Sequence, residues 1–140
     1  MARLTRLEVR DVASRRPEEA RTLAKRSGCT VLLKGMPSLV ATPSGHLLVD
    51  TVGSSDLAAA GMGDVLTGVV ASLLAQGCTP PEAAALGLFT SGRAAARSGL
   101  GVSLTPGDVV EHLPEAFQED GDGSTELEFP FVLFDQDPAR

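Results

Sequence analysis

The chain has 140 residues, of which 43% are hydrophobic and 21% are charged, as is typical of one globular domain. This composition excludes a disordered protein and a collagen. No apolar run approaches the length of a membrane span, so we expect no membrane partner and no signal peptide. Cys29 and Cys78 lack the spacing of a disulfide scaffold or metal site. They favour two buried, reduced thiols in a cytoplasmic protein.

The net charge of −6 comes from the C-terminal end of the chain. Residues 118–140 contain seven acidic side chains and one Arg, whereas the preceding residues contain eleven of each sign. Residues 3–26 hold eight basic and four acidic side chains, a mixture that favours a solvated helix surface. The chain also lacks Trp and Tyr, which commonly stack on bases. We therefore expect no nucleic-acid partner.

The first half of the sequence predicts alternating helical and extended segments. Pro17 is suited to the first turn of a helix that runs to Gly28, with acidic residues early and basic residues late. A buried, mostly apolar run over 29–34 follows, which predicts a strand. Residues 39–42 and 46–50 predict two strands joined by a turn at Pro43-Ser44-Gly45. Residues 51–60 are small and predict a loop.

The second half of the sequence predicts helices. From Gly61 to Gln76 the apolar residues recur with helical spacing and form one face, and Gly77 ends the pattern. Pro80 and Pro81 predict the start of a helix that runs to about Ser98. Further elements are a helix capped at Thr105 that ends at Phe117, a disordered segment over 118–125, and a strand over 129–134. The fold class is therefore α/β in the first half and helical in the second.

The segment from Ala58 to Gly68 is the most informative for function. A loop of small residues leads directly into the amphipathic helix, whose first N–H groups have no partners within the helix. Gly61 and Gly63 allow an anion to approach these groups closely, so a phosphate fits there. Asp64 in the first turn places a carboxylate beside that anion site. A base beside a phosphate site is the arrangement that phosphoryl transfer to a hydroxyl requires.

A purely structural interpretation of this segment also stands. Acidic residues are common in the first turn of a helix because they interact with its dipole, and glycine-rich loops often serve only as tight turns. The pattern matches neither a Walker A motif nor the dinucleotide fingerprint. On the residues alone, both interpretations remain open.

Two motifs carry a resemblance to a known family. GMGDVLTGVVASLLAQG, followed by TPPEAAALG, resembles the signature of the ribokinase-like ADP- or ATP-dependent NAD(P)H-hydrate dehydratases, in which a loop GNxGxAxGGxGDVLxG precedes a helix. Upstream, TVLLKGMPSLVATPSG resembles the family's VVLKGxxTxIxxPxG at the matching distance. Together the matches cover about residues 1–117.

The resemblance implies a lyase that repairs hydrated NADH or NADPH. The family phosphorylates the hydrate hydroxyl with ADP or ATP and then eliminates phosphate, so Mg²⁺ is expected with the nucleotide. Asp64 falls on the family's substrate-binding acid, which is the expected base. Gly61, Met62 and Gly63 fall on the anion hole, and Gly63 also on the nucleotide. The remaining nucleotide-binding positions implied are Lys34, Gly35, Met36, Pro37 and Ser38.

Three departures from the family pattern bear on these expectations. Ser54 stands where the family usually has Asn, and Ala60 stands where it has Gly. The opening residues MARL resemble the end of the family's mid-domain segment HPGEMARL. The resemblance therefore implies the C-terminal portion of a ribokinase-like domain over residues 1–117 and an acidic, partly disordered tail over 118–140. We expect such a chain to form a homo-oligomer or to associate with a missing N-terminal half.

Two alternative functions remain open on the sequence. A small-molecule kinase of the same superfamily shares an Asp after a glycine-rich anion hole. A non-catalytic fragment, which needs a partner or the missing half, would bind nucleotide weakly or not at all. Release of phosphate together with NADH distinguishes the dehydratase from the kinase.

Overall fold

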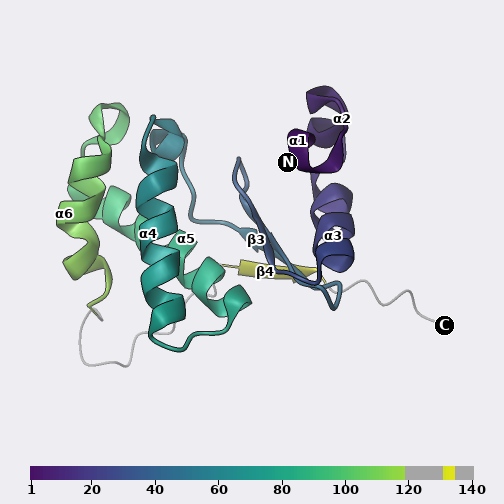
Figure 1. Ribbon diagram of the computed structural model, residues 1–140. Coiled ribbons are helices and arrows are strands. Elements are labelled where there is room, and N and C mark those ends of the chain that lie inside the picture. The colour runs from purple at the N-terminus through teal and green to yellow at the C-terminus, as the bar shows by residue number, and fades with distance from the viewer. Residues whose placement is uncertain (119–130, 135–140) are drawn as a thin grey trace.

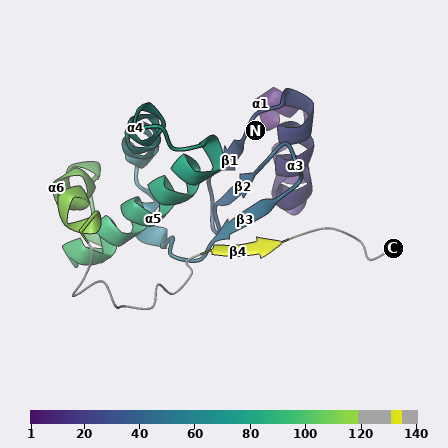
Figure 2. The ribbon, with the colours of Figure 1, turned by 90° about the horizontal axis from the view of Figure 1, so that it is seen from below.

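The computed structural model describes residues 1–118 and 131–134, which form three layers. A sheet lies between two groups of helices, as Figures 1 and 2 show. One group covers one face of the sheet and the second group lies on the other side. The first group comprises α1 (Ala2–Thr5), α2 (Val9–Ser14) and α3 (Arg16–Ser27), and the second comprises α4 (Met62–Ala75), α5 (Pro80–Ser98) and α6 (Pro106–Ala116).

The described sheet has four strands in the order β1-β2-β3-β4, and each neighbouring pair is antiparallel. The hairpin predicted between the second and third strands is present. Of the strand predicted over 129–134, residues 131–134 are described and form a strand that pairs with β3. Residues 129–130, and all but residue 118 of the segment predicted to be disordered over 118–125, lie outside the described residues. The four strands are β1 (Val31–Leu33), β2 (Leu39–Ala41), β3 (Leu47–Asp50) and β4 (Phe131–Phe134).

The first strand departs from the prediction of a buried run. All three residues of β1 are only half-buried. Among the described residues β1 pairs with β2 alone, so it lies at an edge of this sheet. A continuous apolar run such as 29–34 predicts burial because it is typical of a strand that is covered on both sides, and β1 lacks that cover. The predicted burial of the two cysteines is also wrong, since Cys29 is exposed and Cys78 is half-buried.

Residues of β2 alternate between the two helical layers. Leu39 and Ala41 pack with Ala20 and Ala24 of α3. Val40, which lies between them, packs on the opposite face with Leu66 of α4 and with residues of α5. Because successive side chains of a strand point to opposite faces, this apolar run is buried on both sides. All three β2 residues are buried, in agreement with a strand in the middle of the fold.

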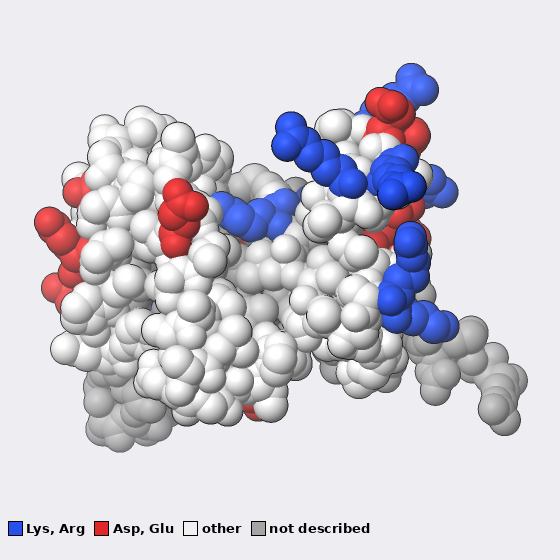
Figure 3. All heavy atoms as spheres, in the orientation of Figure 1, with Lys and Arg blue, Asp and Glu red and all other residues white. Residues whose placement is uncertain are grey.

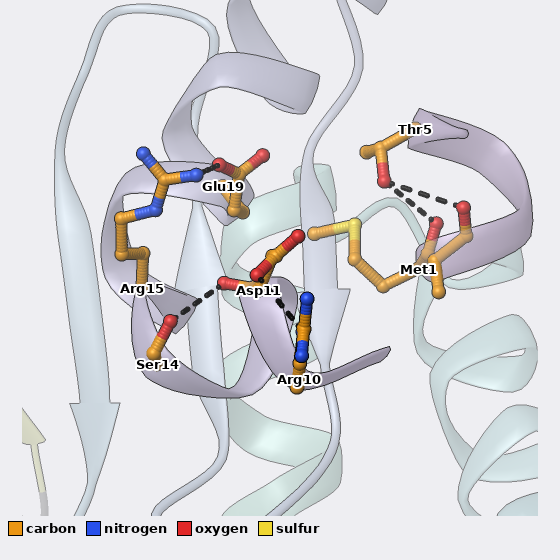
Figure 4. A network of polar contacts seen from close by, with 8 residues as sticks. Met1, Thr5, Arg10, Asp11, Ser14, Arg15 and Glu19 are labelled. Atoms are coloured by element: carbon orange, nitrogen blue, oxygen red, sulfur yellow. Dashed lines mark hydrogen bonds and ion pairs between the residues drawn. The ribbon is translucent and has the colours of Figure 1, made fainter. Parts of the chain in front are cut away.

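The helix predicted from Pro17 to Gly28 is α3, with Pro17 in its first turn and Gly28 in the left-handed conformation at its C-cap. The sequence did not predict α1 and α2, which are short. Figure 4 shows the polar contacts that accompany them. The Thr5 hydroxyl donates to the Met1 carbonyl at 3.2 Å, and Arg15 lies 3.8 Å from the Glu19 carboxylate. Such short helices depend on contacts of this kind.

The helices α4, α5 and α6 fall where the sequence predicts them. The close approach of α4 and α5 occurs at Gly87, where an added Cβ would lie 2.6 Å from Val70 Cγ2. The predicted loop over 51–60 contains one 3₁₀ turn, η1 (Ser55–Ala58), and a second turn, η2 (Gly101–Ser103), precedes α6.

Both α5 and α6 begin with a capping box. Thr79 pairs with Glu82 and Thr105 with Asp108, each hydroxyl donating to the carboxylate at 2.6 Å. These hydrogen bonds, together with those from the backbone N–H of the same Thr, lower the pKa of the Glu82 and Asp108 carboxyl groups. The pKa of both carboxyl groups is therefore lower in the folded protein than in the unfolded chain. At pH values above the unfolded-state pKa, the ionised capping boxes stabilise the folded state. This stabilisation is lost as the pH falls through the folded-state pKa.

Charge is unevenly distributed over the visible surface in Figure 3. Basic side chains gather over the α1–α3 side, where acidic side chains lie among them. The α4–α6 side shows mostly uncharged atoms with a few acidic groups. The basic residues of 3–26 thus belong to a mixed helix surface, as expected. None of the helices in the described ranges is long and apolar enough to cross a membrane.

A matched pair of glycine substitutions tests the α4–α5 contact. We expect Gly87→Val to lower the free energy of unfolding by about 1–3 kcal/mol, because the added atoms collide with Val70. Gly68→Ala should instead raise it by about 0.5–1 kcal/mol, since Gly68 lies within α4 and nothing lies within 4 Å of an added Cβ. Urea unfolding measures both. Equal effects of the two variants would contradict this packing.

Candidate functional site

A cavity of about 430 Å³ lies between the loop that precedes β2, the segment that follows β3, the N-terminal part of α4 and the middle of α5. The loop over 34–38, called here the KGMPS loop, contributes one wall. Segments 50–55 and 57–59 contribute a second, and α4 and α5 contribute the third. Its lining residues are Lys34, Gly35, Met36, Ser38, Asp50, Gly53, Ser54, Ser55, Leu57, Ala58, Ala59, Met62, Leu66, Leu88 and Ser91.

The structure brings two of the sequence-predicted segments together. The Lys34 ammonium group reaches across to the start of α4, where its Nζ lies 3.4 Å from the position that a Cβ on Gly63 would take. Lys34 is exposed and makes no ion pair within the described part of the chain. A cation and a helix N-terminus repel each other weakly unless an anion lies between them. Their proximity therefore marks a place suited to an anion.

The N-terminus of α4 has free backbone donors. Met62 N–H already donates to the Ala59 carbonyl at 3.3 Å, and Asp64 N–H donates to Gly61 at 3.0 Å. Within the described residues, the N–H groups of Gly61 and Gly63 make no backbone hydrogen bond. Gly61 has φ of +89°, and an added Cβ would lie 3.0 Å from Pro106 Cγ, so both its conformation and its neighbour favour glycine. Of the three predicted anion-hole residues, Gly61 and Gly63 therefore have backbone N–H groups that are available to an anion, whereas the Met62 N–H is already paired.

Asp64 lies in the first turn of α4, as predicted, and its side chain is exposed. It does not belong to the lining of the cavity, and neither do Gly61, Gly63 and Pro37. Met62 does line it. Asp64 thus follows Gly63 in the first turn of α4, one residue beyond it and outside the cavity lining, with its side chain open to solvent.

Arg16, which the sequence analysis did not single out, holds the KGMPS loop. Its guanidinium group donates to three backbone carbonyl groups, those of Lys34 at 3.3 Å, Met36 at 3.3 Å and Pro37 at 2.8 Å. A Cβ on Gly35 would collide with this guanidinium group. The planar fork of Arg suits several acceptors at once. No motif reveals this contact, because the partners are backbone atoms about twenty residues away in sequence.

The loop after β3 is held by its own polar side chains. Asp50 is buried, and its Oδ1 accepts hydrogen bonds from the N–H groups of Val52 at 3.0 Å and Gly53 at 3.3 Å. Ser54, at the position of the family's Asn, caps η1 by accepting from Asp56 N–H at 3.2 Å. The Ser54 side chain therefore forms its hydrogen bonds within its own loop. Ala60 is exposed beside Gly61.

The comparisons with known proteins agree on one family. The family model described as NAD(P)H-hydrate dehydratase matches residues 1–115. The chain belongs to this family. A bifunctional NAD(P)H-hydrate repair enzyme of Salinibacter ruber is 40% identical over 107 residues. An ADP-dependent (S)-NAD(P)H-hydrate dehydratase of Neisseria meningitidis is 39% identical over 113 residues.

A solved structure is similar in fold. Bacillus subtilis YxkO superposes with a TM-score of 0.73 and 26% identity, over 80% of this chain. The predicted fold class, a partial ribokinase-like α/β fold, is therefore confirmed. The chain covers 43% of YxkO, 38% of the Neisseria enzyme and 20% of the Salinibacter enzyme, whereas 78% and 74% of this chain match the latter two.

The Arg16 contacts generate a prediction about the KGMPS loop. In Arg16→Lys, amide hydrogen exchange in residues 34–38 should accelerate about threefold to tenfold, because an ammonium group cannot serve three separated carbonyl groups. Arg10→Lys is the control, since the Arg10 side chain is 88% exposed and its ion pair among the described residues is with the neighbouring Asp11. Unchanged exchange in Arg16→Lys would show that the loop holds its shape without the guanidinium group.

Proposed function

We propose that this chain carries the nucleotide-binding and catalytic portion of an NAD(P)H-hydrate dehydratase. It would restore hydrated NADH or NADPH with ADP, or ATP, as phosphoryl donor. The observation that carries this proposal is the convergence of Lys34 and the start of α4 at one end of a cavity. The Neisseria relative, named as ADP-dependent, supports ADP as the donor.

The first step assigned to this site is binding of the donor phosphates. The free N–H groups of Gly61 and Gly63 would donate to phosphate oxygens, and the Lys34 ammonium group would neutralise part of their charge. The KGMPS loop, including Gly35, Met36, Pro37 and Ser38, would line the remainder of the nucleotide. Donors aligned before the reaction also stabilise the charge that develops on the transferred group.

Asp64 is the proposed base. As the terminal phosphoryl group moves to the hydrate hydroxyl, the Asp64 carboxylate accepts the hydroxyl proton, and ADP leaves as AMP. The phosphorylated carbon then loses phosphate while the neighbouring carbon loses a proton, and the ring double bond returns. The exposed position of Asp64 in the first turn of α4 suits a base that meets a large second substrate arriving from solvent.

We expect Mg²⁺ to bind together with the nucleotide phosphates. No cluster of three metal-ligating side chains occurs among the residues that the structure describes. Mg²⁺ commonly binds through substrate phosphates and water with one or two carboxylates. In this proposal the ion would arrive with ADP or ATP, bound to the phosphates.

We further propose that the chain works in the cytoplasm, as a homo-oligomer or together with an N-terminal half of the domain. Two observations support association. Strand β1 lies at a described sheet edge with half-buried apolar residues, and Val9 and Val102 are 73% and 95% exposed. The chain spans 43% of YxkO, and in this proposal a partner would supply the remaining part of that fold. Within this proposal, residues 1–117 are the family portion and 118–140 the acidic tail.

The direct test of function is recovery of NADH from its hydrate by the purified chain with ADP or ATP and Mg²⁺. Asp64→Asn should slow turnover by about 10²–10⁴-fold while the thermal unfolding curve remains unchanged, because the amide cannot accept the proton. A phosphorylated product without NADH would assign a kinase instead. Absence of both products would assign a non-catalytic fragment, and full activity of Asp64→Asn would remove Asp64 from the mechanism.

A second prediction addresses the anion site. Gly63→Val should weaken ADP binding, measured by calorimetry, by about tenfold or more, because the side chain occupies the space between the α4 amides and Lys34. Gly68→Ala on the same helix is the control, since its added methyl group contacts nothing. Equal ADP affinity in Gly63→Val and wild type would place the phosphates elsewhere.

A further inference from the structure

The lining of the cavity includes a buried hydroxyl group without a hydrogen-bond partner among the described residues. Ser91, in the middle of α5, is 6% exposed and belongs to the cavity lining. Its Oγ is the single buried side-chain N or O atom in the described part of the chain that makes no hydrogen bond. Buried hydroxyl groups are nearly always paired, because an unpaired one loses its hydrogen bonds to water without replacement.

Other hydroxyl groups of the same helix behave in the usual way. Thr90 Oγ1 donates to the Leu86 carbonyl at 2.8 Å, and Ser98 Oγ donates to the Ala95 carbonyl at 2.7 Å. A Ser or Thr inside a helix commonly pairs with the carbonyl three or four residues earlier. The Ser91 hydroxyl group makes no such hydrogen bond, so its Oγ is available to a molecule in the cavity.

Close packing fixes the place of Ser91. The neighbouring Gly92 lies against the loop after β3, where an added Cβ would be 3.1 Å from Val52 Cγ1. One turn earlier, Gly87 lies against Val70 of α4. Because both contacts involve glycines without space for a side chain, α5 cannot shift or rotate freely. A hydroxyl group on such a rigid element is well placed to select a ligand atom.

The surroundings of Ser91 indicate which part of a ligand it meets. Leu66 and Leu88, which share the cavity wall, are apolar and buried, and the buried carboxyl group of Asp50 lines the same cavity. A phosphate here would lose its hydration among apolar groups and face a carboxylate of like charge. Lys34, which lines the cavity and approaches the start of α4, offers the opposite conditions, namely access to water and a positive charge. An uncharged polar group therefore fits beside Ser91.

We propose that the Ser91 hydroxyl binds the uncharged nucleoside part of the nucleotide by a hydrogen bond. This inference rests on the proposed function, because that function supplies the nucleotide and its phosphates at the Lys34 end. Ser91 would thus be a binding residue that fixes how deeply the nucleoside enters, and through this depth where the phosphates stand relative to α4.

The test measures binding of four probes to the full 140-residue chain by calorimetry: adenosine, AMP, ADP and pyrophosphate. Ser91→Ala should weaken adenosine, AMP and ADP by a similar factor of about tenfold and leave pyrophosphate unchanged. The melting temperature of Ser91→Ala should equal or exceed that of wild type, because the variant removes an unpaired buried hydroxyl group. A merely structural Ser would show the reverse, with lower stability and unchanged affinity.

Two control variants separate this inference from the proposed function. Thr90→Val removes a neighbouring buried hydroxyl group that is already paired, and all four affinities should be unchanged. Lys34→Met should weaken ADP and pyrophosphate more than adenosine. If Lys34→Met weakens ADP and Ser91→Ala does not, the Ser91 inference is overturned and the nucleotide site stands. Equal loss of pyrophosphate in Ser91→Ala also overturns it, and a wild-type chain that binds no ADP overturns both proposals.

Discussion

Burial of β2 from both sides is the constraint on which the candidate site depends. Leu39 and Ala41 pack on α3, while Val40 packs on α4 and α5. A slip of one residue would exchange these faces and break both contacts, so the register of β2 is strongly specified. The KGMPS loop enters directly into this strand. Its position relative to α4 is therefore set by the core rather than by the loop itself.

The loop then receives support from the opposite layer. Arg16 belongs to α3, yet its guanidinium group holds carbonyl groups of residues 34, 36 and 37. With its carbonyl groups held in this way, the loop presents the Lys34 side chain toward Gly63 at the start of α4. The sheet and both helical layers thus cooperate to bring one cation to one helix N-terminus. This arrangement explains how a short, exposed loop can serve as a defined binding wall.

Elements with strong local signals were predictable from the sequence. The Pro-to-Gly pattern defined α3, the spacing of apolar residues defined α4, and the Thr105 cap with Asp108 defined α6. The roles of segments 34–38 and 61–64 remain predictions: the family resemblance implied the first, whereas the glycine-rich loop before a helix suggested the second from the residues themselves. No spacing along the chain reveals that Lys34 reaches Gly63.

Other features were hidden from the sequence for physical reasons. The helices α1 and α2 are too short to show a periodic pattern. The half-buried state of β1 depends on which strands lie beside it, and an apolar run does not encode its neighbours. Arg16 acts on backbone carbonyl groups, which leave no trace in residue identity. In the sequence, Ser91 cannot be distinguished from any other serine in a helix; its missing hydrogen bond becomes evident in the structure alone.

The charges around the cavity favour one orientation of a nucleotide bound in it. Lys34 is exposed at one end, whereas the Asp50 carboxyl group is buried in the wall. A ligand with an anionic and an uncharged end gains from only one orientation in this field, because reversal would bury phosphate beside a carboxylate. Under the proposed function the terminal phosphate would then face the first turn of α4, which carries the exposed Asp64. The polarity that orients the donor would thus bring its reactive end to the proposed base.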